Sequence, residues 1–333
     1  MEIKSNTLYR KYRPENFDEV LGQEEIINIL KKSIENKNIA HSYLFSGDRG
    51  TGKTSTARIF AKEIGCAPED IYEMDAASNR GINEIREIRD SVDIRPMSSE
   101  YKVYIIDEVH MLTKDAFNAL LKTLEEPPKH VIFILATTEK EKVLPTIISR
   151  CQVFDFQNPS NEILADLVKR VVKKEGRKID DESALEIAKK GNGSFRDTLS
   201  VLQKVLTSIS DEIKIDEVKK VFGNNFGDLE NSFLKALVEK DREKTFEIYL
   251  KLKKNNFHLN SFLENILDKI RNSLLLKNSA SFEKEFKSGD KEFLKEIKLN
   301  SGHLKKFLEI DEKISLSSQP EIAFELFLVE FFE

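Results

Sequence analysis

The sequence predicts an α/β domain with a parallel sheet, followed by a region built from helices only. In the first half of the chain, short apolar runs rich in β-branched or aromatic residues alternate with segments of helical periodicity. This alternation is typical of a parallel sheet covered by helices on both faces. Seven of the eight prolines lie at or before Pro159, and none lies between Pro159 and Pro320. The chain therefore changes character near residue 160.

Five strands are predicted in the first half. They cover residues 42–45, 71–74, 103–106, 131–135 and 153–156. Thr113 is a predicted N-cap for a helix over residues 116–124, because its hydroxyl can accept a hydrogen bond from a free backbone N–H. Together these elements predict a five-stranded parallel sheet with covering helices.

The second half is predicted to contain helices only. Three short ones are expected over residues 163–174, 183–190 and 194–207, and a longer helical section follows Gly227. We expect domains at residues 1–160, 161–224 and 225–333. The last helix carries more apolar side chains than one narrow stripe holds: Phe324, Phe327, Leu328, Phe331 and Phe332. They fit either a self-contained core or a face covered by neighbouring subunits, and we favour the second.

Composition excludes several classes of protein. The 333 residues carry a net charge of −5, which argues against non-specific nucleic-acid binding by bulk charge but leaves a local basic surface open. No run approaches the length of a membrane span, and no signal-peptide core is visible, so we expect a cytoplasmic protein without membrane contact. Cys66 and Cys151 form no CxxC pair, so neither a disulfide framework nor a zinc site is indicated.

One glycine-rich loop predicts nucleotide binding. It reads Gly47-Asp48-Arg49-Gly50-Thr51-Gly52-Lys53-Thr54 and matches G-x-x-x-x-G-K-[ST] in full. A predicted strand precedes it and a predicted helix follows it, as phosphate binding requires. Backbone N–H groups and the helix N-terminus would surround phosphate oxygens, Lys53 would reach the β- and γ-phosphates, and the Thr54 hydroxyl would bind Mg²⁺. The sequence therefore predicts ATP and Mg²⁺ as ligands.

A second motif supplies the chemistry. The apolar strand over residues 103–106 ends in Asp107 and Glu108. Asp107 is placed to hold the metal with Thr54, and Glu108 is placed to orient or deprotonate a water molecule. Nothing in the sequence indicates the acceptor pocket of a kinase, so hydrolysis of the γ-phosphate is the favoured reaction.

These motifs resemble the AAA+ ATPases of clamp loaders, and most closely the gamma/tau subunits of bacterial DNA polymerase III. The N-terminal run Leu-Tyr-Arg-Lys-Tyr-Arg-Pro at residues 8–14 contributes to the likeness, as does Leu-Gly-Gln at residues 21–23. Further similar segments lie at residues 108–112, 116–128, 135–139 and 149–151. The likeness is close over residues 7–205 and weaker beyond Gly227. It implies an AAA+ nucleotide domain, a small helical lid and an all-α collar.

The resemblance also implies site residues. Those that would bind ATP are Tyr12, Arg13, Val20, Gly22, Gly47, Asp48, Arg49, Gly50, Thr51, Gly52, Lys53, Thr54, Ser55, Thr138 and Arg196. Those that would take part in hydrolysis are Lys53, Asp107, Glu108, Arg150 and Arg196, with Thr54 and Asp107 on Mg²⁺. Thr137 or Thr138 resembles the sensor of the γ-phosphate, Arg150 the arginine finger that reaches a neighbour's ATP, and Arg196 the second sensor. From spacing alone, Arg150 also fits a surface arginine, and Arg196 fits a residue that caps or salt-bridges its own helix.

The resemblance implies DNA and protein partners as well. Ser78, Asn79, Arg80 and Arg86 correspond to a region that faces the DNA duplex, although a solvated helix face explains them too. The implied partners are subunits of the delta and delta-prime type, further copies of this chain, the sliding clamp and primer–template DNA. The implied function is ATP-driven loading of the clamp during replication. The complex belongs to a DNA-directed DNA polymerase, but no polymerase active site is seen in this chain.

Two departures leave alternatives open. Family members usually carry a four-cysteine zinc module after the P-loop helix, whereas only Cys66 stands there, so we predict no zinc. The chain resembles the short gamma form. The alternatives are a small subunit of an archaeal or eukaryotic clamp loader, another AAA+ motor such as a branch-migration helicase, and a non-hydrolysing scaffold. The helicase would need a C-terminal winged helix, and the scaffold would have a degraded P-loop.

Overall fold

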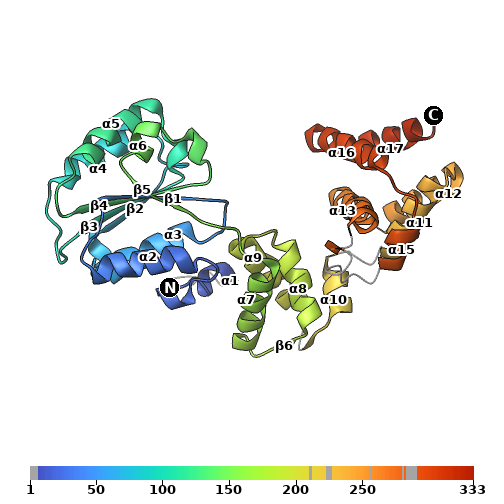
Figure 1. Cartoon of the computed structure of the whole chain (residues 1–333), viewed down its shortest axis with the longest axis horizontal. Coiled ribbons are helices and arrows are strands. Elements are labelled where there is room, and N and C mark those ends of the chain that lie inside the picture. Colours follow the sequence, from blue (N-terminus) through green and yellow to red (C-terminus); the bar gives the residue numbers. More distant parts are fainter. Residues whose placement is uncertain (1–6, 210–211, 223–226, 256, 280, 283–290) are drawn as a thin grey trace. The chain divides into compact units, whose positions relative to one another are not determined.

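The computed structural model describes residues 7–209, 212–222, 227–255, 257–279, 281–282 and 291–333. They belong to two compact units, divided between Val218 and Lys219 (Figure 1). The first unit contains both the sheet and the helices that were expected as a separate lid. The predicted boundary at residues 224 and 225 lies outside the described residues, and the division into three domains stays a prediction.

A five-stranded parallel sheet forms the centre of the first unit, which confirms the predicted fold class. The strands are β1 (Ser42–Ser46), β2 (Ile71–Asp75), β3 (Lys102–Asp107), β4 (Val131–Thr137) and β5 (Gln152–Asp155). Their order across the sheet is β2-β3-β4-β1-β5. Ser46 of β1 pairs with Thr137 of β4 and with Asp155 of β5, so these strands end level with one another.

Side chains of the sheet alternate between two apolar layers. Tyr43 and Phe45 face the layer formed with α2 (Glu24–Glu35) and α3 (Lys53–Glu63). Leu44 faces the opposite layer, which includes side chains from the remaining covering helices. Those helices are α4 (Ile82–Val92), α5 (Lys114–Glu125) and α6 (Pro145–Ile148), on the other side of the sheet in Figure 1. Both faces are buried, as parallel sheets require. The predicted cap at Thr113 is confirmed, because its side chain accepts a hydrogen bond from Ala116 N.

Short 3-10 turns link several of these elements. They are η1 (Phe17–Glu19), η2 (Pro68–Asp70), η3 (Val109–Met111) and η4 (Lys140–Lys142). Of these, η3 directly follows the strand that carries Asp107, so the chain turns sharply after the two acidic residues.

The three helices predicted after residue 160 are confirmed. They are α7 (Asn161–Lys174), α8 (Asp181–Lys190) and α9 (Phe195–Ser208), followed by α10 (Ile215–Val221). The prediction of helices only was wrong at one place. Two-residue strands β6 (Lys178–Ile179) and β7 (Glu212–Ile213) pair in parallel between these helices. Strands this short give no alternating pattern for a sequence to reveal.

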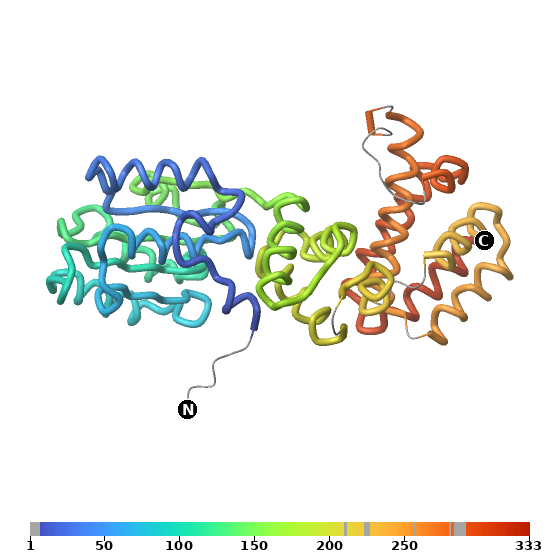
Figure 2. The backbone as a smooth tube through the Cα atoms, turned by 90° about the horizontal axis from the view of Figure 1, so that it is seen from below, coloured from blue at the N-terminus to red at the C-terminus, as the bar shows by residue number. Residues whose placement is uncertain are grey.

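The N-terminal helix α1 (Leu8–Lys11) is attached to the helices of residues 161–208. Leu8 N donates to Gln203 Oε1 of α9 at 2.9 Å. Lys11 Nζ and the Tyr12 hydroxyl both donate to Glu175 Oε1, at 2.7 and 2.5 Å. In Figure 2 the blue N-terminal segment runs next to these green helices. The beginning of the chain therefore joins the two parts of the first unit.

The second unit is helical in its described residues. It contains α11 (Gly227–Val238), α12 (Arg242–Lys254), α13 (Leu259–Asn278), α15 (Lys291–Glu296), α16 (Ser301–Leu316) and α17 (Pro320–Phe331). Phe324 and Leu328 are fully buried in this unit's own core. Packing within the unit therefore explains these two side chains without a neighbouring subunit. The exposed apolar side chains of α16 and α17 are others, including Leu316 and Ile322. No helix of the described residues has both the length and the apolar character needed to cross a membrane.

Polar contacts stabilise the short connection between α3 and β2. This is the place where the sequence analysis considered a zinc module. The fully buried Asp70 accepts hydrogen bonds from Met97 N at 2.6 Å and Ser98 N at 2.9 Å. The Cys66 thiol donates to Tyr101 O at 3.2 Å, and burial raises the pKa of Cys66 to about 11. In the part of the chain that the structure describes, no group of three or more His, Cys, Asp or Glu residues could hold a metal ion.

Replacing Asp70 should destabilise the first unit. Asp70→Ala removes the acceptor of the Met97 and Ser98 backbone N–H groups and leaves a gap where the buried carboxylate lay, so we expect a loss of about 2 kcal/mol in the free energy of unfolding. Urea denaturation of the full chain measures this. Asp90→Ala is the control, because the Asp90 side chain is 67% exposed and pairs only at the surface with Arg89. A loss for Asp70→Ala no larger than that for Asp90→Ala would contradict the role given to Asp70.

Candidate functional site

The glycine-rich loop connects β1 to α3 and leaves no room for side chains at two of its glycines. Gly47 has φ +139°, and a Cβ there would lie 2.5 Å from Phe156 O. Gly50 has φ +79°, and a Cβ there would lie 2.0 Å from Ser194 Oγ. The loop therefore packs tightly and runs into the N-terminus of α3. Free N–H groups at such a helix start form a site for anions.

Lys53 brings a positive charge to this loop. Its side chain is folded back, and Nζ donates to Gly47 O and Asp48 O, each at 2.8 Å. The residue is only 5% exposed, and burial lowers the pKa of Lys53, while the nearby carboxylates of Glu108 and Asp107 act in the opposite direction. The ammonium group thus feels the charges of Asp107, at the end of β3, and of Glu108, which follows it.

Thr54 and Asp107 meet between α3 and the end of β3. Thr54 Oγ1 donates to Asp107 Oδ2 at 2.7 Å, and Asp107 Oδ1 accepts from Glu108 N at 3.0 Å. A hydroxyl and a carboxylate beside a phosphate site are the oxygen ligands that Mg²⁺ prefers in nucleotide-binding proteins. These two side chains therefore fit the predicted metal.

Glu108 adopts an unusual backbone conformation. Its φ of +51° and ψ of +44° lie in the left-handed region, which costs free energy for a residue other than glycine. Its Oε2 accepts a hydrogen bond from Thr138 Oγ1 at 3.0 Å and lies 3.5 Å from His110 Nδ1. Residues in this conformation concentrate at functional sites, which supports a chemical role for Glu108.

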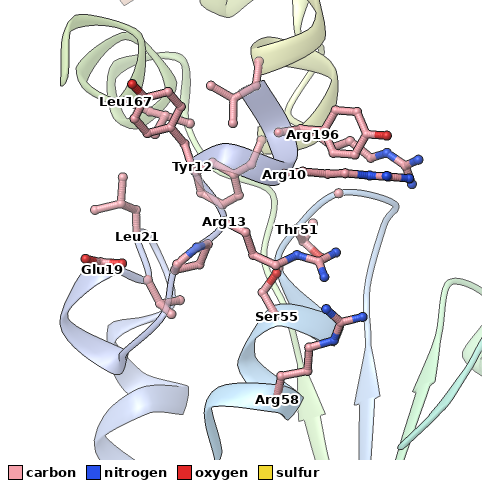
Figure 3. Close-up of a pocket in the computed structure, with 17 residues that line it drawn as sticks. Arg10, Tyr12, Arg13, Glu19, Leu21, Thr51, Ser55, Arg58, Leu167 and Arg196 are labelled. Carbon is pink, nitrogen blue, oxygen red and sulfur yellow. The ribbon is translucent and has the colours of Figure 1, made fainter. Parts of the chain in front are cut away.

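A cavity of about 630 Å³ opens beside the loop (Figure 3). This volume suits a small-molecule ligand. The predicted residues that line it are Tyr12, Arg13, Val20, Gly50, Thr51, Gly52, Ser55 and Arg196. Leu21, between the predicted Val20 and Gly22, also lines it. The lining residues that the sequence analysis missed are Tyr9, Arg10, Pro14, Glu19, Arg58, Leu167, Phe195 and Leu199. The cavity is thus enclosed by the N-terminal segment, the loop, α3 and the helices α7 and α9.

Arginines give the cavity a positive lining. Arg196 lies with its guanidinium carbon 4.9 Å from the centre of the Tyr9 ring. Burial lowers the pKa of Arg13, and the neighbouring charge of Arg58 acts in the same direction. Arg58 Nε and Nη2 are held by Glu73, at 2.6 and 2.5 Å. Arg58 follows Ser55 by three residues on α3, so helical spacing from the loop could have revealed it.

Several predicted nucleotide-binding residues lie outside this lining. They are Gly22, Gly47, Asp48, Arg49, Lys53, Thr54 and Thr138. Gly22, with φ +67°, instead packs near Ile163, whose Cδ1 would lie 3.2 Å from a Cβ at this position. Asp48 accepts from Asn158 Nδ2 at 2.6 Å, and Arg49 is exposed. Thr138 follows the end of β4 and is grouped with Glu108.

Arg150 lies at the opposite edge of the sheet. Its backbone oxygen accepts from Ser42 Oγ at the first residue of β1, whereas the glycine-rich loop follows the last residue. At the rise of an extended strand, about 13 Å separates these two ends of β1. The Arg150 side chain extends to Glu125 Oε1 at 2.7 Å and to Thr146 O at 2.6 Å. The structure therefore does not bring Arg150 to the other site residues of its own chain.

The predicted DNA-facing residues are exposed. Ser78, Asn79 and Arg80 follow β2, and Arg86 lies on the outer side of α4. The segment is joined to the site by one backbone contact, because Ala76 N donates to Asp107 O at 2.8 Å. A polar, partly basic surface thus begins next to the strand end that carries Asp107.

The fold and the glycine-rich loop are those of a P-loop protein, and relatives identify the family. The chain is 34% identical over 342 residues to DNA polymerase III subunit gamma of Buchnera aphidicola from Schizaphis graminum, covering 95% of this chain and 93% of that protein. It is 40% identical over 297 residues to DNA polymerase III subunit tau of Bacillus subtilis, covering 83% of this chain and 53% of that protein. The chain belongs to the DNA polymerase III gamma/tau subunit family.

Other comparisons agree with this fold. A family model described as "DNA polymerase III, delta subunit" matches residues 22–81 and 69–160. The solved structure of the Thermotoga maritima RuvB Holliday junction branch migration motor is similar, with a TM-score of 0.56 and 24% identity. That likeness covers 68% of this chain and 80% of RuvB, and it shows the fold alone. The chain spans about half the length of the Bacillus subtilis and Mycoplasma genitalium relatives that it matches, at 53% and 47%.

Gly50→Ala should disturb the cavity. The added methyl group must displace Ser194, and with it the start of α9 that carries Arg196. We expect the affinity for a fluorescent ATP analogue to fall by at least about tenfold, or 1.4 kcal/mol. Adding Ser194→Gly removes the clashing hydroxyl and should restore part of the affinity.

The control is Gly65→Ala. Gly65 also has a positive φ, of +82°, but no atom lies within 4 Å of its added Cβ. This variant should lose some stability without losing nucleotide affinity. Unchanged binding in Gly50→Ala, or equal losses in both variants, would contradict the role given to the Gly50–Ser194 contact.

Proposed function

We propose that this chain is an ATP-hydrolysing subunit of the DNA polymerase III clamp loader, which loads the sliding clamp onto primed DNA. Membership of the gamma/tau family supports the complex and the process. One contact in the site supports the chemistry: Thr54 Oγ1 lies 2.7 Å from Asp107 Oδ2, beside the glycine-rich loop. An intact loop and an intact acidic pair favour an active ATPase over a scaffold.

Different residues of the chain would bind different parts of ATP. The base and ribose side of ATP would occupy the cavity bounded by Tyr12, Arg13 and Val20. The phosphates would follow the loop to the start of α3, where Lys53 would exchange its two carbonyl partners for phosphate oxygens. Arg196, from α9, would place a permanently charged guanidinium on the same phosphates. Binding or loss of the nucleotide would thereby affect the position of the helices of residues 161–208.

The acidic pair performs the hydrolysis in this proposal. Mg²⁺, held by Thr54 and Asp107, would neutralise charge on the phosphate oxygens. Glu108 would orient the attacking water and accept its proton. The Thr138 hydroxyl, which donates to Glu108 Oε2, would report the γ-phosphate to β4. The carboxylates of Glu108 and Asp107 raise the pKa of Lys53 against the effect of its burial, which favours the charged form of the ammonium group.

Arg150 would complete the site of another subunit. Because it lies at the edge of the sheet opposite its own loop, it cannot act on its own nucleotide without unfolding the strand between them. A neighbouring chain whose loop faces this edge would receive the guanidinium at its γ-phosphate. Arginines supplied in this way stabilise the charge of the transition state. ATP would then bind best where two subunits meet.

DNA would bind on the exposed segment after β2. Ser78, Asn79, Arg80 and Arg86 offer hydroxyl, amide and guanidinium donors suited to backbone phosphates rather than base edges. The contact between Ala76 N and Asp107 O connects this segment to the metal-binding strand. The proposed partners are subunits of the delta and delta-prime type, copies of this chain, the sliding clamp and primer–template DNA. The helices of residues 225–333 would serve as a collar between subunits.

ATPase activity should depend on the partners. The purified chain should hydrolyse ATP slowly, and its partner subunits, the clamp and primed DNA together should raise kcat by at least about tenfold, since the catalytic geometry is completed only in the assembly. A coupled ATPase assay with each component omitted in turn measures this. Activity that is equal with and without the partners, clamp and DNA would exclude the clamp-loader function.

Arg150→Ala should separate binding from hydrolysis. ATP affinity should stay within about twofold, while hydrolysis in the complete assembly should fall by at least about 100-fold, as for other arginines supplied in trans. Arg170→Ala, on the exposed side of α7, is the matched surface control and should change neither quantity. If Arg150→Ala abolished ATP binding by the isolated chain, Arg150 would act within its own chain and the proposal for it would fail.

A further inference from the structure

His110 is a buried histidine that the proposed mechanism does not yet use. Its side chain is only 5% exposed and lies among three polar residues of the site. Nδ1 lies 3.0 Å from Thr137 Oγ1 and 3.5 Å from Glu108 Oε2. Nε2 lies 3.1 Å from Glu139 Oε1. The ring therefore spans from the candidate catalytic carboxylate to the residues at the end of β4.

The partners of the ring fix its orientation. A carboxylate only accepts hydrogen bonds, so Glu139 requires a hydrogen on Nε2. Nδ1 forms a hydrogen bond with the Thr137 hydroxyl. The same hydroxyl oxygen accepts from Glu139 N at 3.0 Å. Each polar group in this cluster has a partner, so the ring is held on both sides.

This cluster determines where the next hydroxyl lies. Thr137 is fully buried and is the last residue of β4. Thr138 follows it directly, and its Oγ1 donates to Glu108 Oε2 at 3.0 Å. Glu108 itself lies in a left-handed turn between β3 and η3. The hydrogen bonds of the sheet therefore do not fix the direction of its side chain. The hydrogen bond that positions its carboxylate comes from the Thr138 hydroxyl.

We propose that His110 is a positioning residue for Glu108: held by Glu139 and Thr137, its ring fixes the end of β4 so that the Thr138 hydroxyl meets the Glu108 carboxylate. The inference rests on the proposed hydrolysis of ATP. His110 does not touch the nucleotide in this scheme and acts only through Glu108. Its loss therefore affects the rate of the chemical step rather than the binding of ATP.

The main test compares kcat with KM in the assembly with partner subunits, clamp and primed DNA. His110→Ala should lower kcat for Mg-ATP by about 10- to 100-fold, the effect of a misplaced catalytic group, with KM and the Kd for ATP within about twofold. His110→Asn, which keeps a polar group near Thr137 Oγ1, should recover part of kcat. His130→Ala is the control, because His130 binds Val92 O at 2.9 Å away from the site and should leave kcat unchanged.

A second pair of variants keeps the test decisive if His110→Ala does not fold. Glu139→Ala frees the ring without removing it and should lower kcat in the same direction. Lys142→Ala removes only the ion pair between Lys142 Nζ and Glu139 Oε2, at 2.5 Å, and should have no effect. Equal kcat in Glu139→Ala and Lys142→Ala, both as in the wild type, would overturn the inference.

Glu108→Gln separates the inference from the proposed function. This variant should lower hydrolysis to a small but measurable residual rate, and adding His110→Ala should then cause no further loss, because the two residues act as one unit. Normal hydrolysis in Glu108→Gln would overturn the proposed function itself. Loss of hydrolysis in Glu108→Gln together with wild-type kcat in His110→Ala, or with a further independent loss in the double variant, would overturn only the role of His110.

Discussion

The parallel register of β1, β3 and β4 is the constraint on which the whole site depends. Ser46 pairs with Thr137, and Ile106 pairs with Leu135, so the three strands end within a residue or two of one another. The glycine-rich loop, the Asp107–Glu108 pair and the two threonines at the end of β4 therefore lie at one edge of the sheet. A shift of one residue in either pairing would also exchange the two apolar faces of a strand, so burial of both faces holds the register.

Local sequence patterns predicted the elements at this edge of the sheet, because each motif there can be recognised from a few consecutive residues. Five strands and the cap at Thr113 followed from apolar runs and turn chemistry, and the loop followed from its glycines. The wall formed by Tyr9, Arg10, Leu167 and Leu199 did not, because it exists only where α1 and the helices α7 and α9 approach the loop. No local pattern encodes that approach. The strands β6 and β7 escaped for a related reason, since only the packing of the helices around them brings them together.

The glycine-rich loop also contacts the helices that follow the sheet. Phe195 N donates to Gly50 O at 3.0 Å, next to the close contact between Gly50 and Ser194. Glycine at position 50 is therefore required by α9 as much as by a phosphate. A nucleotide that changes the conformation of the loop must move the start of α9 or strain this contact. The lid proposed for residues 161–224 thus has a direct mechanical connection to the ligand, independent of Arg196.

Placing Arg150 at one edge of the sheet and the nucleotide site at the other has a consequence for assembly. In the proposed mechanism one chain holds two unlike halves of a catalytic site, and this requires head-to-tail contacts, which close into rings or continue as spirals. The present partner of Arg150 does not oppose this. Its ion pair with Glu125 has side chains that are 33% and 48% exposed, and exposed pairs of this kind contribute about 0–1 kcal/mol. The phosphates of a neighbour's ATP offer a stronger, multiply charged partner, so Arg150 can leave Glu125 at little cost when a subunit docks.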